Sequence, residues 1–252
     1  MMTTEPARRP LLQLRIVSPP AGSERGVPEV RPVVDGQDLL VDGSSHWRGA
    51  SPRHLLDPDD RPLHADAVPR EVRLAGGGCG VESCCGALYV TVVRDGDEVV
   101  WSGWRDPAGP GIRLPELRFD AEPYEAEVRR ATADRGWEWP ACAVARLLEA
   151  ALRRREDWLA RWECELEAVW AARREPDRIH VVLGHPGIDL EDGRPWLQFG
   201  LTLLVDDGDP TEQAGRFEAQ LTAADPRAVA EVWGGSADAE RLGYPWPPTL
   251  GE

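Results

Sequence analysis

The chain has 252 residues, and its 29 basic and 44 acidic side chains give a formal net charge of −15 at pH 7. About 42% of the residues are hydrophobic and 29% are charged, which is the composition of a globular protein rather than a disordered one. All 29 basic side chains are arginine, and lysine is absent. The absence of lysine excludes Schiff-base chemistry, the lysine-containing phosphate loop of nucleotide hydrolases and the protein-kinase signature.

The acidic balance argues against binding to nucleic acid, because proteins that bind phosphate backbones present clustered positive charge. Arginines cluster at residues 153–155 and 173–174, but glutamates lie beside both clusters. No stretch reaches the roughly 20 apolar residues that a membrane helix needs. We therefore expect a cytoplasmic protein with no nucleic-acid or membrane partner, whose acidic surface suits a basic protein partner.

Short strands separated by turn residues are predicted for the N-terminal half. Alternating apolar residues predict a strand over residues 11–17, and residues 29–42 read as a hairpin that turns at Asp35-Gly36. Residues 43–69 are rich in Pro, Asp, His and Ser, and they predict a long loop. Further strands are predicted over 71–74, 88–93, 98–101 and 117–120.

Helices and strands mix in the rest of the chain. A helix is predicted to begin at residue 120 or 121, and residues 142–154 have the clearest amphipathic pattern. Residues 164–172, 179–183 and 196–205 predict three antiparallel strands, with Leu166 and Trp170 on the same side of the first. Helices are then expected over 211–223 and 226–232.

This order of elements predicts an α+β fold with antiparallel sheets and three to four helices. A division near residue 120 would separate a β-rich half (1–120), which contains the cysteine-glycine loop, from a mixed α+β half (121–252). One continuous domain is the alternative.

Three of the five cysteines, Cys79, Cys84 and Cys85, lie in a glycine-rich loop. Thiolates in such a loop can converge on zinc, because glycine permits the positive φ angles that a metal knuckle demands. A structural zinc needs a fourth ligand. The long loop offers three histidines for it: His46, His54 and His64. We take His54 as the candidate; the alternatives are small buried residues with no cofactor, or a redox-active cysteine pair.

The stretch from Arg73 to Trp104 resembles one found in uncharacterised acidic proteins of GC-rich bacteria. It reads RLAGGGCGVESCCGALYVTVVRDGDEVVWSGW. In those proteins a cysteine-glycine knuckle also precedes a hairpin that ends in a similar V-V-W segment. They often carry a further cysteine where this chain has Gly76 to Gly78. The resemblance covers about an eighth of the chain, and it implies no activity.

Eleven tryptophans are many for a chain of this length. Trp158 and Trp162 are four residues apart, which predicts one buried helix face. Trp137, Trp139 and Trp246 lie in loop-like surroundings beside proline. Exposed tryptophan near arginine is favoured at protein–protein hot spots, so these three are candidate interaction residues. Packing onto the domain is the alternative.

These observations favour a non-enzymatic protein-binding module, acting as an inhibitor or immunity factor for a basic partner. The reasons are the charge, the tryptophan and arginine content, and the lack of a catalytic set. His180 and His185, for example, are at odd spacing and would lie on opposite faces of a regular strand. One alternative is a zinc- or thiol-dependent enzyme that uses the Cys79/Cys84/Cys85 loop. A second is a structural component of a larger assembly, which only the tryptophans favour.

Overall fold

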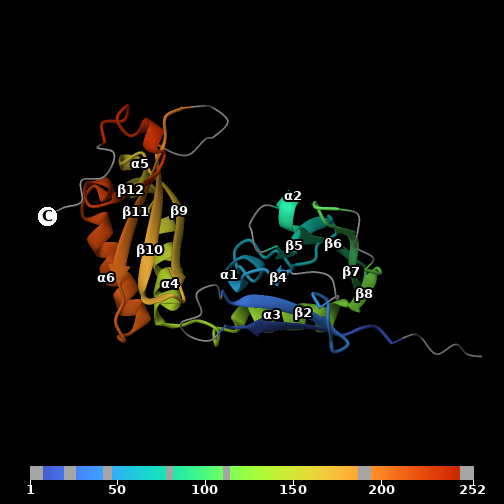
Figure 1. The fold of residues 1–252 in the computed structure, drawn as a ribbon. Coiled ribbons are helices and arrows are strands. Elements are labelled where there is room, and N and C mark those ends of the chain that lie inside the picture. The colour runs from blue at the N-terminus through green and yellow to red at the C-terminus, as the bar shows by residue number, and fades with distance from the viewer. Residues whose placement is uncertain are drawn as a thin grey trace, which may run out of the picture. The chain divides into compact units, whose positions relative to one another are not determined.

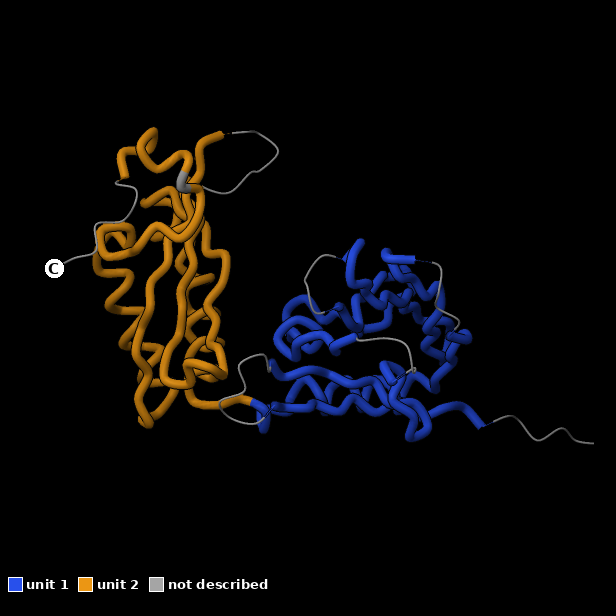
Figure 2. Tube along the Cα trace, viewed as in Figure 1, with its two compact units in different colours: residues 1–19, 26–137 blue, residues 20–25, 138–252 orange. Residues whose placement is uncertain are grey.

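Two separate apolar cores organise the chain. The computed structural model describes residues 8–19, 27–41, 47–77, 82–109, 114–186 and 194–244. These residues form two compact units, which divide between Trp137 and Glu138 and have different colours in Figure 2. Each unit buries its own cluster of apolar side chains, so each is a folded body that can be described by itself.

The described part of the first unit contains two antiparallel sheets and three helices. Its strands are β1 (Leu12–Val17), β2 (Glu29–Val34), β3 (Gln37–Asp38), β4 (Arg48–Gly49), β5 (Arg70–Gly76), β6 (Ala87–Asp95), β7 (Glu98–Arg105) and β8 (Leu117–Asp120). Its helices are α1 (Pro52–Leu55), α2 (Glu82–Cys85) and α3 (Ala121–Ala133). The strand orders are β1-β2-β3 and β4-β5-β6-β7-β8 (Figure 1).

Helix α3 belongs to the first unit because it covers β1, an edge strand. Glu127 of α3 accepts a hydrogen bond from the main-chain N–H of Leu14 (2.6 Å), and Arg130 donates one to the carbonyl of the same residue (2.9 Å). These side chains provide hydrogen-bond partners for backbone groups that have none within the sheet, because β1 is an edge strand. The division between the units therefore lies after α3, and not before it at residue 120 as expected.

An aromatic group closes the core of the first unit. Trp101 makes edge-to-face contacts with Phe119 and Tyr124, at centroid distances of 5.5 Å and 6.2 Å. The hydroxyl of Tyr124 accepts a hydrogen bond from the indole N–H of Trp101 (3.2 Å) and donates one to the carbonyl of Leu63 (2.8 Å). Burial raises the pKa of Tyr124. The hydroxyl therefore ties the segment around Leu63 to α3 and β7.

The described part of the second unit is one antiparallel sheet with helices packed against it. Its strands are β9 (Glu165–Ala172), β10 (Glu175–His185), β11 (Leu197–Leu204) and β12 (Glu231–Gly234), in the order β12-β11-β10-β9 (Figure 1). Its helices are α4 (Pro140–Arg153), α5 (Glu156–Arg161) and α6 (Pro210–Thr222), followed by the 3-10 turns η1 (Pro226–Ala228) and η2 (Ser236–Asp238). Apolar side chains of α4 and α6 share one core with the sheet. Its strand residues include Leu166, Val169, Val181, Leu183 and Phe199.

The α+β class with antiparallel sheets is confirmed, and so is the hairpin predicted over residues 29–42. The strands predicted over 88–93 and 98–101 pair as β6 and β7. The described chain has six α-helices rather than three to four. Helix α5 contains Trp158, as the Trp158/Trp162 spacing predicts, and Trp162 is its C-cap. Helices α1 and α2 are single turns, too short to show an amphipathic period. The helix expected over 226–232 is wrong, because the 3-10 turn η1 is followed by strand β12.

Candidate functional site

A one-residue bulge in β9 decides which side chains lie on the outer face of the second sheet, away from α4 and α6. Leu166 and Ala168 pair with consecutive residues of β10, so Glu167 is an extra residue in the ladder. The alternation of faces changes at such a bulge. Leu166 therefore lies in the core, while Trp170 pairs with His180 on the outer face. The expectation that Leu166 and Trp170 lie on the same side is wrong for this reason.

Three rings lie side by side on this outer face. The ring of His180 is 4.2 Å from that of Trp170 and 5.6 Å from that of Trp233. Trp233 comes from β12 and lies over Gly200, where a Cβ would be 1.9 Å from Cδ2 of the indole. Nδ1 of His180 is 3.1 Å from the hydroxyl of Thr202, directly across the ladder. We call the surface formed by Trp170, His180 and Trp233 the aromatic face.

Two carboxylates contact rings of the aromatic face, and a third accepts a hydrogen bond from β11 of the same sheet. Glu175 lies 3.2 Å from Nε2 of the imidazole, and Glu231 accepts a hydrogen bond (3.3 Å) from the indole N–H of Trp233. Glu167, the bulged residue, accepts one from the side-chain amide of Gln198 (2.6 Å), and its Oε1 is buried and accepts no hydrogen bond from the described residues. Within the described ranges none of these three carboxylates forms an ion pair with arginine. Their negative charge is therefore not neutralised by an arginine of the described chain.

The aromatic face is accessible, because α4 and α6 pack on the opposite face of the sheet. Trp233 is 37% exposed, and Glu231 beside it is exposed. Arg178 lies two residues before His180 on β10, and its guanidinium forms an ion pair with the carboxylate of Asp177 (4.0 Å). An exposed indole attracts a cation over its ring, and a free carboxylate accepts charge-assisted hydrogen bonds. The aromatic face thus combines the two kinds of group that bind guanidinium or ammonium.

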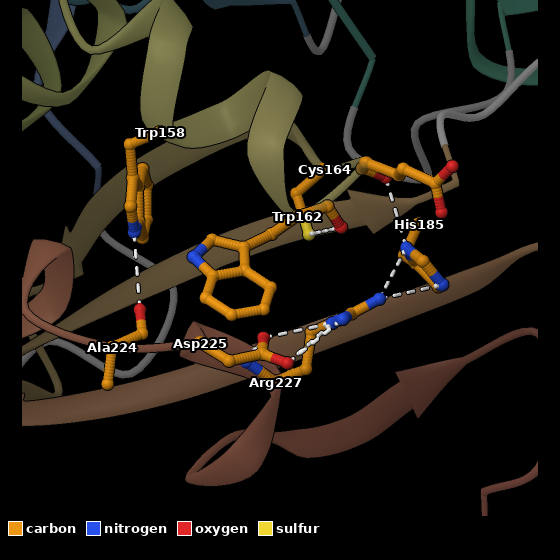
Figure 3. Close-up of polar contacts among 8 residues, drawn as sticks. Trp158, Trp162, Cys164, His185, Ala224, Asp225 and Arg227 are labelled. Atoms are coloured by element: carbon orange, nitrogen blue, oxygen red, sulfur yellow. Dashed lines mark hydrogen bonds and ion pairs between the residues drawn. The ribbon is translucent and has the colours of Figure 1, made fainter.

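A second polar cluster lies at the end of β10. Figure 3 shows the guanidinium of Arg227 reaching both the carboxylate of Asp225 and the ring of His185. Arg227 donates to the two carboxylate oxygens at 2.9 Å each, and its Nη1 lies 3.2 Å from Nε2 of His185. Nδ1 of the same ring is 3.0 Å from the carbonyl of Glu163. A carbonyl only accepts, so this network assigns the proton to Nδ1 and makes Nε2 the acceptor for Arg227.

Burial and the charge of Arg227 control titration in this cluster. The hydrogen bond from Arg227 holds the pKa of Asp225 below its ordinary value. Burial raises the pKa of Cys164 to about 11, and it also raises the pKa of Tyr244. The Cys164 thiol contacts the carbonyl of Trp162 (3.3 Å) and is protonated at neutral pH. Both ring nitrogens of the imidazole are engaged as well, so the cluster fastens η1 to the ends of β9 and β10.

The candidate zinc ligands lie in the first unit. Cys79 lies outside the described residues. Cys84 has an exposed free thiol on α2, Cys85 beside it is disulfide-bonded, and His54 is exposed on α1. A sulfur in a disulfide is not a thiolate and does not ligate zinc in that state. In the part of the chain that the structure describes, no three His, Cys, Asp or Glu residues are grouped to hold a metal. The zinc site, which includes Cys79, stays a prediction.

Two of the candidate interaction tryptophans are held by packing. Trp137 is buried, and its indole N–H donates to the carbonyl of Asp134 (3.0 Å). Trp139 is half-buried against the core of the second unit, and Arg173 lies 4.6 Å above its ring. Trp246 lies outside the described residues. For the first two, the structure agrees with the alternative of packing onto the domain.

The exposed ring at the aromatic face, Trp233, was not predicted as an interaction residue. Its strand, β12, begins within the last two residues of the helix predicted over 226–232, and the bulge in β9 is not evident in the residue pattern. One signal was present: Gly200 interrupts an apolar strand, and such a glycine often marks a close approach to the backbone.

No protein-family model, curated protein or solved structure matches the chain. Among the described residues, no helix combines the length and the apolar character that crossing a membrane requires. The aromatic rings and carboxylates of the site are therefore the basis for the function proposed below.

Proposed function

We propose that this protein binds a partner protein with a basic surface, and that arginine side chains of the partner dock on the aromatic face. One observation carries the proposal. The rings of Trp170, His180 and Trp233 lie together. Glu175 contacts the ring of His180 and Glu231 contacts that of Trp233, and no arginine of the described chain neutralises either carboxylate. A guanidinium can stack on an indole and donate to a carboxylate at the same time.

Two carboxylates elsewhere in the protein, in contrast, are paired with arginine. Glu71 receives two hydrogen bonds from Arg105, at 2.9 Å and 2.7 Å. Glu138 likewise receives two from Arg146, at 2.7 Å and 3.0 Å. Since arginine is the usual partner of a carboxylate in this chain, the unpaired charge at the aromatic face supports binding of an external cation.

The net charge of −15 would accelerate association with a basic partner, because long-range attraction steers the encounter. A protein that covers the basic surface of an enzyme blocks access to that surface. The role within this proposal is therefore that of a cytoplasmic inhibitor or immunity factor, with a basic protein and not nucleic acid as its target.

The proposal is tested with a fluorescently labelled hexa-arginine peptide, whose anisotropy is measured as the full chain is added. Wild-type protein should bind saturably. Trp233→Leu should weaken binding about ten-fold, which is the loss of a cation–π contact of about 1 to 2 kcal/mol. Hexa-lysine should bind more weakly than hexa-arginine, because an ammonium cannot stack as a planar guanidinium does.

The matched control is Glu240→Gln, which removes an exposed carboxylate away from the aromatic face. It should bind hexa-arginine as the wild type does. Equal affinity of wild type and Trp233→Leu would overturn the docking site, and so would an equal loss in both variants, since the general acidity of the surface would then explain binding.

A further inference from the structure

The first unit contains a cavity of about 460 Å³ between helix α3 and residues 55–64. Pockets that enclose small molecules have volumes of about 300 to 1,000 Å³. The cavity belongs to a different unit from the aromatic face, so an inference drawn from it does not rest on the proposed function.

The floor of the cavity is apolar. Leu55 and Leu63 are buried there, and Val128 of α3 lies beside them. Tyr124 also lines the cavity, but its hydroxyl already donates to the carbonyl of Leu63 and accepts from the indole of Trp101. Tyr124 therefore offers a ligand only its ring. Such a floor favours a hydrocarbon body over a polar one, since a buried polar group without a partner is costly.

The rim of the cavity carries both arginines and carboxylates. Arg61, Arg129 and Arg135 line it together with two carboxylates, Asp57 and Glu125. Oδ1 of Asp57 is occupied by the main-chain N–H groups of the two residues at 59 and 60. Glu125 bonds to an arginine of β6 and lies 3.9 Å from Arg129.

Arg61 is positioned without being neutralised. Its Nη2 lies 2.9 Å from Nδ1 of His64, and Nε2 of His64 lies 3.3 Å from the carboxylate of Asp66. A carboxylate only accepts hydrogen bonds, so the contact with Asp66 assigns the proton of His64 to Nε2. Nδ1 of His64 is then the acceptor for Arg61. Arg61 forms no ion pair with the described carboxylates, so its remaining N–H groups are available to a ligand.

We propose that this cavity binds a small molecule with a hydrocarbon body and a single carboxylate. The body lies on Leu63 and Val128, and the carboxylate bonds to the guanidinium groups of Arg61 and Arg129. The planar N–H donors of guanidinium match the geometry of a carboxylate. Asp57 and Glu125 also line the cavity, and their negative charge disfavours a dianion such as a phosphate monoester.

The probe is octanoate, titrated into the full chain by isothermal calorimetry. The wild type should bind one octanoate per chain. Arg61→Gln and Arg129→Gln should each weaken binding about ten-fold, as the loss of a charge-assisted hydrogen bond predicts. Octanol should bind at least about ten-fold more weakly than octanoate for the same reason. Arg174→Gln, which removes an exposed arginine of the second unit, should leave the affinity unchanged.

A cavity-filling variant, Val128→Phe, locates the binding site. It should abolish octanoate binding while the thermal unfolding transition is retained; if that variant fails to fold, the two arginine variants decide the outcome. The proposal is overturned if octanol binds as well as octanoate, or if Arg61→Gln and Arg129→Gln bind like Arg174→Gln. It is also overturned if the wild type shows no saturable binding.

Discussion

The indole of Trp233 covers the α-carbon of Gly200, so closely that a Cβ at residue 200 would lie 1.9 to 2.4 Å from three atoms of the ring. The ring is held there from two other sides, by the carboxylate of Glu231 and by the imidazole of His180. Glycine at position 200 is therefore a requirement of the aromatic face and not of the strand itself, because its φ is not in the left-handed region.

Gly200→Ala should displace Trp233 and damage the aromatic face. The added methyl group overpacks the site, which should lower the free energy of unfolding by about 1 to 3 kcal/mol and weaken hexa-arginine binding several-fold. Urea unfolding and peptide anisotropy measure the two effects. Gly215→Ala on α6 is the control, since a Cβ there meets no atom within 4 Å. It should raise stability by about 0.5 to 1 kcal/mol.

Tyr124→Phe should destabilise the first unit. The change leaves the buried indole N–H of Trp101 and the carbonyl of Leu63 without their partner, at a cost of about 1 to 3 kcal/mol in unfolding free energy. Tyr89→Phe is the control, because the hydroxyl of Tyr89 bonds to the half-buried carboxylate of Glu82. Its cost should be below about 1 kcal/mol. Equal losses in the two variants would contradict the role given to Tyr124.

Asp225→Asn should change how stability depends on pH. Arg227 lowers the pKa of Asp225 in the folded state, so the ionised carboxylate stabilises the fold above the unfolded-state pKa of about 4. That contribution is lost as the pH falls through the lower, folded-state pKa. At neutral pH the variant should be about 1 kcal/mol less stable. The difference between variant and wild type should shrink below about pH 4.

Urea unfolding of wild type and Asp225→Asn across this pH range measures the difference. The variant keeps an oxygen that can accept from the N–H of Arg227, so the comparison isolates the charge. If the difference in unfolding free energy between the two proteins stays constant down to acid pH, the charge of the Asp225 carboxylate does not stabilise the fold.

The cysteines should fall into three classes of reactivity. Cys84, exposed and free, should react rapidly with a thiol reagent in the native protein. Cys142 and Cys164 are buried, and burial raises the pKa of Cys164 to about 11, so both should react only after unfolding. Because Cys85 is disulfide-bonded, unfolding without reductant should expose the thiols of Cys84, Cys142 and Cys164 but not that of Cys85.

The same assay, with elemental analysis for zinc, distinguishes the disulfide from the predicted metal site. Five thiols without reductant would contradict the disulfide. One zinc per chain, with Cys84 protected until a chelator is added, would support the predicted ligands Cys79, Cys84, Cys85 and His54.

Local signals in the sequence predicted most of the elements correctly. The turn at Asp35-Gly36 has positive φ at both residues, as a two-residue hairpin turn requires. Helix α4 has its apolar residues at helical spacing, because one of its faces packs against the sheet. Such features depend on neighbouring residues, so a single sequence reveals them.

The aromatic face depends on relations that neighbouring residues do not reveal. A single extra residue, Glu167, reverses the faces of β9 and moves Trp170 away from the core side. Trp233 reaches His180 only because β12 pairs with β11, and these strands are far apart in the sequence. Strand pairing and bulges are tertiary features, so the pattern of residues in either strand alone could not predict the site.

The most direct test of the aromatic face is hydroxyl-radical footprinting with saturating hexa-arginine, read by mass spectrometry for each tryptophan. Trp233 is 37% exposed in the free protein, so bound peptide should reduce its oxidation markedly. Trp104 of the first unit is the internal reference and should be oxidised equally with and without peptide. Unchanged oxidation of Trp233 under conditions where the peptide is bound would contradict the account.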